Sequence, residues 1–308
     1  MDLDVDAAAG VLRAGGLVAF PTETVYGLGA HALDERAVRR VFEVKGRPAD
    51  NPLIVHVASL DEVDRVAVPT PLARRLGGRY WPGPLTVVLD ARVVVPAVTR
   101  GGLGTVAVRV PAHPLALELL RRSGLPLAAP SANRSGRPSP TTAAHVRADL
   151  GDTVPVLDGG PCTVGLESTV VDARGEVPVV LRQGSVGAEE LGAVAGAGPQ
   201  LGASPGTRHR HYAPRCEVVV ADPREGAATA AALVAQGRRV ALVGPPEAPH
   251  GVEHLASVDG AEDLGRRLYA LLREAEDVGV DAVVVEAVPE DGVGRAVMDR
   301  LRRAAEPR

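Results

Sequence analysis

Short apolar runs alternate with helical patterns along most of this sequence, and the alternation is clearest in its last third. The expected order there is strand 217–221, helix 224–236, strand 239–243, helix 260–276, strand 282–286 and helix 294–305. Strands that are separated by helices cannot pair as hairpins, so this order predicts a small, Rossmann-like parallel α/β sheet. The sequence has no repeat of solenoid length.

The first two hundred residues also alternate, but polar loops recur at the ends of the expected strands. We expect strands at 17–20, 53–57, 85–89, 105–110, 125–129, 154–158, 168–172 and 177–181. We expect helices at 5–14, 59–66, 71–80, 114–122, 141–149 and 187–195, and one that begins after Asp34 and ends at Lys45. The polar loops are 21–29, 45–56, 99–109 and 130–141. Ligands of open α/β folds bind where such loops converge.

The chain of 308 residues is long enough for two domains. We expect a first domain at 1–200, a linker at 201–215 and a smaller domain at 216–308. The segment 196–214 is rich in Pro and Gly, as spacers are, yet it also carries Tyr212 and several basic side chains. A passive spacer does not need those side chains.

Composition excludes several classes of protein. The formal net charge is -4, so any site for an anion must be local rather than a property of the whole surface. Cys162 and Cys216 lack CxxC spacing, which predicts two reduced thiols rather than a disulfide or a zinc site. The N-terminus is acidic and no apolar run is long enough to span a bilayer, so we expect a cytoplasmic protein with no membrane association.

The loop from Lys45 to His56 is the most distinctive polar segment. Lys45 is the only lysine of the chain, whereas all other basic residues counted with it are arginines. A lysine that survives such a bias indicates a place where a compact ammonium is needed. Lys45 could instead lie on a solvated helix end. Its neighbours Arg47, Asn51 and His56 favour a functional role, although a lone histidine in a strand is more often a core residue.

Other polar residues extend this pattern. Lys45, Arg47 and Arg109 supply cations, and the loop 130–141 supplies hydrogen-bond donors, namely Ser131, Asn133, Ser139 and Thr141. These are the groups that a polyphosphate requires. Arg109 lies within an expected strand, so it needs an anionic partner, either a substrate or an internal acid. There is no Walker P-loop and no protein nucleophile with a suitable base, which favours catalysis by positioning at phosphorus.

Several ordered motifs resemble the Sua5/YciO/YrdC family. They are Pro-Thr-Glu-Thr-Val-Tyr-Gly-Leu-Gly at 21–29, Lys-Gly-Arg-Pro at 45–48 with Asp-Asn-Pro-Leu at 50–53, Pro-Ser-Ala-Asn at 130–133 and Gly-Leu-Glu-Ser-Thr-Val at 165–170. The linker motifs at 204–206 and 211–214, followed by a second α/β domain, resemble the longer Sua5 type. The resemblance implies a YrdC-like twisted open α/β domain with a cationic groove, joined to a C-terminal Sua5 domain.

The same resemblance implies an activity. Members of this kind are L-threonylcarbamoyladenylate synthases, which are nucleotidyltransferases that join L-threonine, bicarbonate and ATP and release pyrophosphate. Their product supplies the t6A modification at position 37 of tRNAs through a downstream tRNA threonylcarbamoyl-transfer machinery. Mg²⁺ is the implied cofactor, bound mainly through the ATP phosphates.

The resemblance also implies roles for individual residues. L-threonine would be bound by Thr24, His56, Arg109, Ala129 and Ser168. ATP would be bound by Lys45, Arg47, Asn51, Thr105, Ser131, Asn133, Ser139, Arg182 and Tyr212, with Lys45 and Arg47 as the catalytic residues. The linker would fold over the pocket as a lid. Arg208 and His209 stand where the family often has Lys and Tyr, so their contacts are left open.

Two other functions remain as alternatives at this point. Short relatives have been associated with double-stranded RNA, so an RNA-binding protein is one of them, although the chain is net acidic and lacks RRM and KH signatures. A general nucleotide hydrolase is the other. Pyrophosphate release that requires threonine, bicarbonate and ATP together separates the synthase from both.

Overall fold

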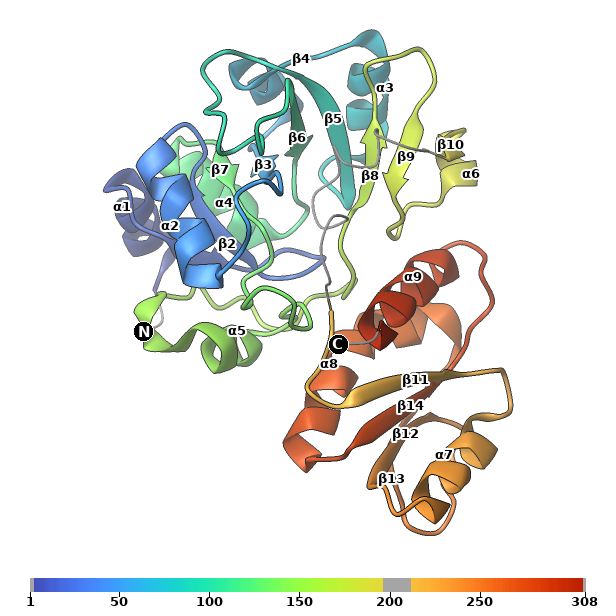
Figure 1. Ribbon diagram of the computed structural model, residues 1–308. Helices are drawn as coiled ribbons and strands as arrows, with labels where there is room; N and C mark the ends of the chain where they lie inside the picture. The colour runs from blue at the N-terminus through green and yellow to red at the C-terminus, as the bar shows by residue number, and fades with distance from the viewer. Residues whose placement is uncertain (1–2, 196–211, 307–308) are drawn as a thin grey trace. The chain divides into compact units, whose positions relative to one another are not determined.

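A computed structural model describes residues 3–195 and 212–306. The chain forms two compact units (Figure 1). The first unit comprises Met1–Ser135 and Ser139–His209, and the second comprises Gly136–Pro138 and Arg210–Arg308. Most of the linker expected at 201–215 lies outside the described residues, so its role as a lid stays a prediction.

The first unit is built on one mixed sheet with the strand order β1-β2-β7-β3-β6-β5-β8-β9-β10, and β4 pairs with β5. The strands are β1 (Val18–Phe20), β2 (Gly27–His31), β3 (Ile54–His56), β4 (Ala67–Val68), β5 (Leu85–Ala91), β6 (Thr105–Arg109), β7 (Leu127–Ala128), β8 (Thr169–Asp172), β9 (Val179–Arg182) and β10 (Val194–Ala195). Strands β3 and β6 are parallel neighbours, so their carboxyl ends meet at the same edge.

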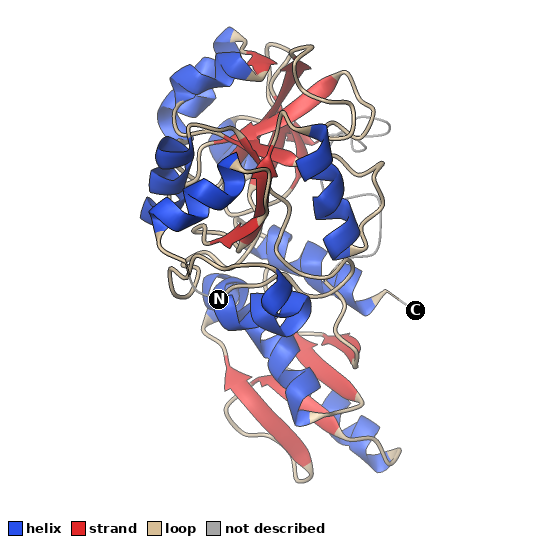
Figure 2. Cartoon of the chain, turned by 90° about the vertical axis from the view of Figure 1, so that its left-hand side faces the viewer, coloured by secondary structure: helices blue, strands red, loops and turns tan. Residues whose placement is uncertain are grey.

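Helices pack against this sheet (Figure 2). They are α1 (Val5–Arg13), α2 (Glu35–Lys45), α3 (Pro71–Tyr80), α4 (Pro114–Ser123), α5 (Ala143–Leu150) and α6 (Ala188–Leu191), with 3₁₀ turns at Leu60–Arg65 and Gly151–Thr153. The Asp34 carboxylate caps α2 by accepting the N–H groups of Arg36 and Ala37. The helix ends at Gly46, whose φ of 61° is the left-handed conformation that glycine favours.

Alternation along the strands separates two faces of the sheet. Val55 and Val108 point into the main core, whereas Ile54 and Ala107 belong to a small apolar cluster with Val88, Val170 and Leu181. Successive side chains of a strand point to opposite faces, so His56 and Arg109 share the face of that small cluster. His56 and Arg109 therefore lie at the edge of this small apolar cluster.

Several expectations for the first unit were wrong in part. The helix expected at 59–66 is a 3₁₀ helix at Leu60–Arg65, and the strand expected at 125–129 is limited to Leu127–Ala128. The loop expected at 21–29 gives way to strand β2 from Gly27, because glycines there leave room for the Phe20 ring; a Cβ at Gly29 would lie 2.8 Å from it. The strand expected at 154–158 is reduced to a single bridge between Ala19 and Val156. The helix expected at 187–195 stops at Leu191 because Gly192 adopts a left-handed φ.

The second unit confirms the predicted parallel sheet. Its strands β11 (Glu217–Ala221), β12 (Val240–Gly244), β13 (Val252–Ser257) and β14 (Ala282–Glu286) lie in the order β11-β14-β12-β13 and are all parallel. Its helices are α7 (Gly226–Ala235), α8 (Gly260–Val278) and α9 (Gly294–Ala305). Strand β13 was not expected, since it is an edge strand with mostly half-exposed side chains and lacks an apolar run.

Both cysteines are free thiols, as expected from their spacing. Across residues 3–195 and 212–306, no helix is both long and apolar enough to span a bilayer.

Candidate functional site

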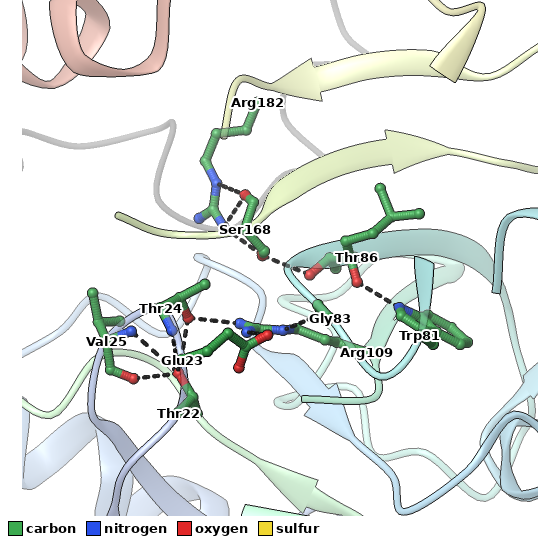
Figure 3. Close-up of polar contacts among 11 residues, drawn as sticks. Thr22, Glu23, Thr24, Val25, Trp81, Gly83, Thr86, Arg109, Ser168 and Arg182 are labelled. Carbon is green, nitrogen blue, oxygen red and sulfur yellow. Dashed lines mark hydrogen bonds and ion pairs between the residues drawn. The ribbon is translucent and has the colours of Figure 1, made fainter. Parts of the chain in front are cut away.

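Arg109, the last residue of β6, is the centre of a buried polar cluster (Figure 3). Its Nη1 donates to Thr24 Oγ1 at 2.9 Å, and its Nε donates to the carbonyl oxygen of Gly83 at 3.1 Å. Its Nη2 lies 2.7 Å from Glu23 Oε1. The anionic partner that the sequence required is therefore an internal acid in this structure, and the binding of a substrate carboxylate stays a prediction.

A rigid turn presents Glu23 and Thr24 to that arginine. Thr22 Oγ1 accepts the N–H groups of Thr24 at 3.1 Å and Val25 at 3.2 Å, and it donates to the Val25 carbonyl at 2.6 Å. A hydroxyl that bonds its own backbone in this way fixes the turn. Sequence reasoning gave no role to Glu23; the signal for it was its place between two threonines of the 21–29 motif.

His56 lies beside Arg109, because the parallel register of β3 and β6 pairs the two residues. Its ring packs edge-on against Phe20, and its Nδ1 has no hydrogen-bond partner. Burial, and then the positive charge of Arg109, lower the pKa of His56 to about 3. The imidazole is therefore neutral near pH 7, so it adds hydrogen-bonding capacity to the site rather than charge.

Ser168 joins further residues that the sequence predicted. Its hydroxyl lies 2.7 Å from Thr86 Oγ1. Arg182 Nη2 donates to the carbonyl oxygen of Ser168 at 2.9 Å and to its hydroxyl at 3.2 Å. The Ser139 hydroxyl donates to Glu167 Oε1 at 2.6 Å, one residue away from Ser168. The structure therefore brings Arg182 into direct contact with Ser168 and links Ser139 to the adjacent Glu167. The sequence had not assigned a role to Glu167 or to Thr86.

Lys45 forms the second polar centre. It is 3 % exposed, because it continues the buried face of α2 one turn beyond Val41 and Phe42. Its Nζ donates to the carbonyl oxygens of Ser131 at 2.6 Å and Asn133 at 2.5 Å, and to Asn133 Oδ1 at 3.3 Å. All three acceptors are neutral. The lysine therefore holds the 131–133 loop in place through hydrogen bonds to neutral oxygens.

The surroundings of Lys45 disfavour its protonated form. Burial, and then the neighbouring positive charge of Arg47, lower the pKa of Lys45 well below its usual value, and Asp149 partly opposes this. Arg47 follows the left-handed Gly46 and donates from Nη2 to the Pro52 carbonyl at 3.2 Å. Asn51 is fully buried in the same loop. An anion that reached this loop would favour the protonated form of Lys45.

Thr105, Ala129 and Tyr212 complete the set of site residues that the sequence predicted. Thr105 begins β6 and Arg109 ends it, so they are about 13 Å apart along the strand. The buried Ala129 donates its N–H to Ile54 O at 2.9 Å, so it is tied through its backbone to the strand that ends in His56. Tyr212 belongs to the second unit, where its ring stacks on Tyr269 with 5.4 Å between centroids. Its contact with ATP stays a prediction.

The remaining reactive groups are Cys162 and the side chains that can bind metals. Cys162 is buried, and this burial raises the pKa of its thiol to about 12, so it stays protonated near pH 7 and is no nucleophile. Among the described residues, His, Cys, Asp and Glu side chains form no group of three or more that could hold a metal ion.

The fold is a mixed α/β sheet with the buried cations Lys45 and Arg109, joined to a smaller parallel α/β unit. These features define a two-domain α/β protein. The family model for Sua5, YciO and YrdC, described as "Telomere recombination", matches residues 10–184. The model described as "Threonylcarbamoyl-AMP synthase, C-terminal domain" matches residues 180–306. The chain belongs to the Sua5/YciO/YrdC family, as its motifs indicated.

Relatives and solved structures agree with this assignment. The chain is 46 % identical to the threonylcarbamoyl-AMP synthase of Pyrococcus abyssi over 97 % of this chain and 93 % of that protein. It is 43 % identical to the Bacillus subtilis synthase over 99 % of this chain and 93 % of that protein. The structure of P. abyssi Sua5 complexed with L-threonine matches with a TM-score of 0.91 and 45 % identity, covering 98 % of this chain and 94 % of that one. The predicted fold class, with YrdC-like and C-terminal Sua5 domains, is confirmed.

Proposed function

We propose that this chain joins L-threonine, bicarbonate and ATP to form threonylcarbamoyl-AMP and pyrophosphate, and that it is therefore a nucleotidyltransferase. One observation supports this above all others. The structure of P. abyssi Sua5 in complex with L-threonine matches 98 % of this chain with a TM-score of 0.91. The geometry around Arg109 and Lys45 supports the same reaction.

The amino acid would bind at the Arg109 end of the site. A guanidinium presents several N–H donors in a planar fork, which suits a carboxylate. Thr24 is already within hydrogen-bond distance of that fork, and the neutral His56 ring lies beside it. Ser168 would complete the set with its hydroxyl. Because Arg109 is buried, its attraction for a carboxylate is little screened by water.

The nucleotide would bind at the Lys45 end. Lys45 fixes the loop that carries Ser131 and Asn133, and Arg47 and Asn51 follow from the same helix end. Arg182 and Ser139 would contact the nucleotide from the opposite side, next to Ser168. Preorganised donors and cations of this kind stabilise developing negative charge without having to reorganise during the reaction.

The reaction needs positioning rather than a covalent enzyme intermediate. Threonine and bicarbonate would first give an N-carboxylate, whose oxygen attacks the α-phosphorus of ATP while pyrophosphate leaves. Both reactants are anions, so Lys45, Arg47 and Arg109 would offset their repulsion. A buried Cys162 thiol with a raised pKa does not compete as a nucleophile.

Mg²⁺ fits this scheme as an ion that arrives with ATP. The described residues offer no cluster of three or more acidic, histidine or cysteine ligands, and Mg²⁺ commonly binds through substrate phosphates and water. Its contribution, when bound, would be to neutralise phosphate charge. We further propose that the product feeds the t6A modification of tRNA through a separate transfer machinery, in the cytoplasm where ATP and tRNA are available.

Labelled bicarbonate tests the proposal directly. The purified chain is incubated with ATP, threonine and [¹⁴C]bicarbonate, and labelled adenylate and pyrophosphate are measured. We expect both to appear only when all three substrates are present. ATP cleavage that ignores threonine would indicate a hydrolase instead, and salt-sensitive RNA binding without turnover would indicate an RNA-binding protein.

A further inference from the structure

Glu23 is a buried acid without an assigned role in the proposed reaction. It is 7 % exposed, and it lies in the turn between β1 and β2 that also carries Thr24 (Figure 3). Its Oε1 lies 2.7 Å from Arg109 Nη2. Neither carboxylate oxygen has a hydrogen-bond partner, and Arg109 Nη2 has none either, because the two charges meet without a well-directed N–H···O bond.

A buried carboxylate without hydrogen-bond donors destabilises the fold unless a ligand supplies the donors. A buried carboxylate without donors loses its hydration and gains too little in return. Among the described residues, the Arg109 guanidinium forms an ion pair with Glu23, and the charge of Glu23 also acts on the His113 imidazole and the Cys162 thiol. Burial lowers the pKa of His113 and raises that of Cys162, so both are neutral near pH 7. Within the described part of the chain, Arg109 is thus the cation paired with Glu23, and Glu23 Oε2 has no donor there.

An α-amino acid matches this pair of charges. Its carboxylate and ammonium are joined through one carbon atom, and a neighbouring guanidinium and carboxylate complement them as a unit. If Arg109 takes the substrate carboxylate, the ammonium comes within reach of Glu23. An ammonium also supplies N–H donors to Oε1 and Oε2, which is what these buried oxygens lack.

We propose that Glu23 binds the α-ammonium of the amino-acid substrate and accepts a proton from it before N-carboxylation. This inference rests on the proposed function. The proton moves from the ammonium nitrogen to a Glu23 oxygen, which leaves a neutral amine and a carboxylic acid. The amine lone pair then forms the N–C bond with the carbon of bicarbonate. Loss of one amine proton and of the hydroxide from that carbon releases water and leaves the N-carboxylate. Glu23 returns its proton to solvent.

The first test compares two ligands. Binding of L-threonine and of (R)-3-hydroxybutyrate, which has no amino group, is measured by calorimetry on the full chain and on Glu23→Gln. We expect the variant to bind threonine about 10- to 100-fold more weakly, as befits loss of a charged hydrogen bond, with no loss of affinity for 3-hydroxybutyrate. Equal weakening of both ligands, or no weakening of either, would overturn the proposal, because it would show a structural role or none.

The second test uses the pH profile of pyrophosphate release at saturating threonine. In Glu23→Gln we expect a rate that is low at neutral pH and recovers as the pH approaches that at which free threonine is an amine. Glu23→Asp keeps the carboxylate and should retain the wild-type shape of the profile at a reduced rate. A Glu23→Gln profile parallel to that of the wild type would rule out proton transfer to Glu23.

Two controls keep these results interpretable. Glu43→Gln removes one negative charge from an exposed position of α2 and should leave both the ligand preference and the profile unchanged. Thermal melting shows whether Glu23→Gln is folded, and Glu23→Asp provides the comparison if it is not. A wild-type chain without turnover would refute the proposed function. A normal wild type with a normal Glu23→Gln would refute the role of Glu23 alone.

Discussion

The sheet edge that carries His56 and Arg109 in the first unit and the sheet edge that ends in Glu286 in the second unit carry different ionisable groups. In the first unit, the carboxyl ends of β3 and β6 carry His56 and Arg109, and Lys45 stands among neutral oxygens. In the second unit, β14 ends in Glu286, whose carboxylate accepts the Gly226 N–H at the start of α7 at 2.9 Å. A helix N-terminus attracts anions, and here one of the chain's own acids already occupies it.

The Glu286 carboxylate packs closely against the start of α7. A Cβ at Gly226 would lie 2.5 Å from the Cγ of Glu286, so the glycine is needed for the carboxylate to approach. The loops that follow the strands add Asp222 and Glu290, and Glu290 is paired with Arg302. Both units are α/β, yet we expect ATP to bind at the first unit alone, because the sheet edge of that unit offers cations. The predictions below test this contrast.

The largest effect is expected for Lys45→Ala. The substitution removes a buried cation and also three hydrogen bonds to the 131–133 loop. We expect formation of labelled adenylate to fall by a factor of about 100 or more, since preorganised charge is a dominant catalytic term. Arg36→Ala, on the exposed face of the same helix, is the matched control and should stay near wild type. An active and folded Lys45→Ala chain would contradict the role of this centre.

The next effect is expected for Arg109→Lys. Lysine keeps the charge but loses the fork that reaches Thr24, Gly83 and Glu23 together. We expect the KM for threonine to rise about 10-fold or more, and the KM for ATP to change far less, because ATP is assigned to the other end of the site. Steady-state kinetics with each substrate varied in turn measures both. Equal changes in the two KM values would break the separation of the two ends.

His56→Gln should change how stability depends on pH. The folded-state pKa of His56, about 3, lies below its ordinary value of 6.5. The unfolded chain therefore binds a proton that the folded chain does not as the pH falls from about 6.5 towards 3, so stability is lost over that range. The loss amounts to a few kcal/mol, on the order of 1.4 per pH unit.

Urea unfolding at pH 7 and pH 4 measures this effect. The wild type should lose more stability between the two pH values than His56→Gln does, since glutamine has no proton to bind. Carboxylates titrate in the same range in both chains, so the difference between them is the quantity that counts. Identical losses in the two chains would show that His56 is not held neutral by the fold.

The smallest effect is expected for Glu286→Gln in the second unit. It weakens a single hydrogen bond at the start of α7, so the free energy of unfolding should fall by about 0.5 to 1.5 kcal/mol. Turnover should be unchanged, and equilibrium dialysis should show one ATP site per chain before and after the change. Loss of ATP binding in this variant would place a nucleotide site in the second unit and reverse the contrast.

The sequence predicted the features that depend on local pattern. The alternation in 217–305 gave the parallel sheet, and the Asp34 cap and the Lys45-Gly46 end gave α2. It could not show that Lys45 bonds Ser131 and Asn133, since these residues are 86 and 88 positions away. The link between Glu23 and Arg109 spans a similar distance along the chain. The sequence did not predict edge strand β13, because its side chains are mostly half-exposed or exposed and show no regular alternation.

The stereochemical course at the α-phosphorus tests the central claim most directly. The claim is that buried cations position the N-carboxylate for direct attack on ATP, with no adenylated residue in between. ATP made chiral at its α-phosphorus with oxygen isotopes is converted to the adenylate, and the configuration of the product is determined by ³¹P NMR. We expect inversion, as one in-line displacement requires. Retention would reveal two displacements and a protein nucleophile, and would contradict the account.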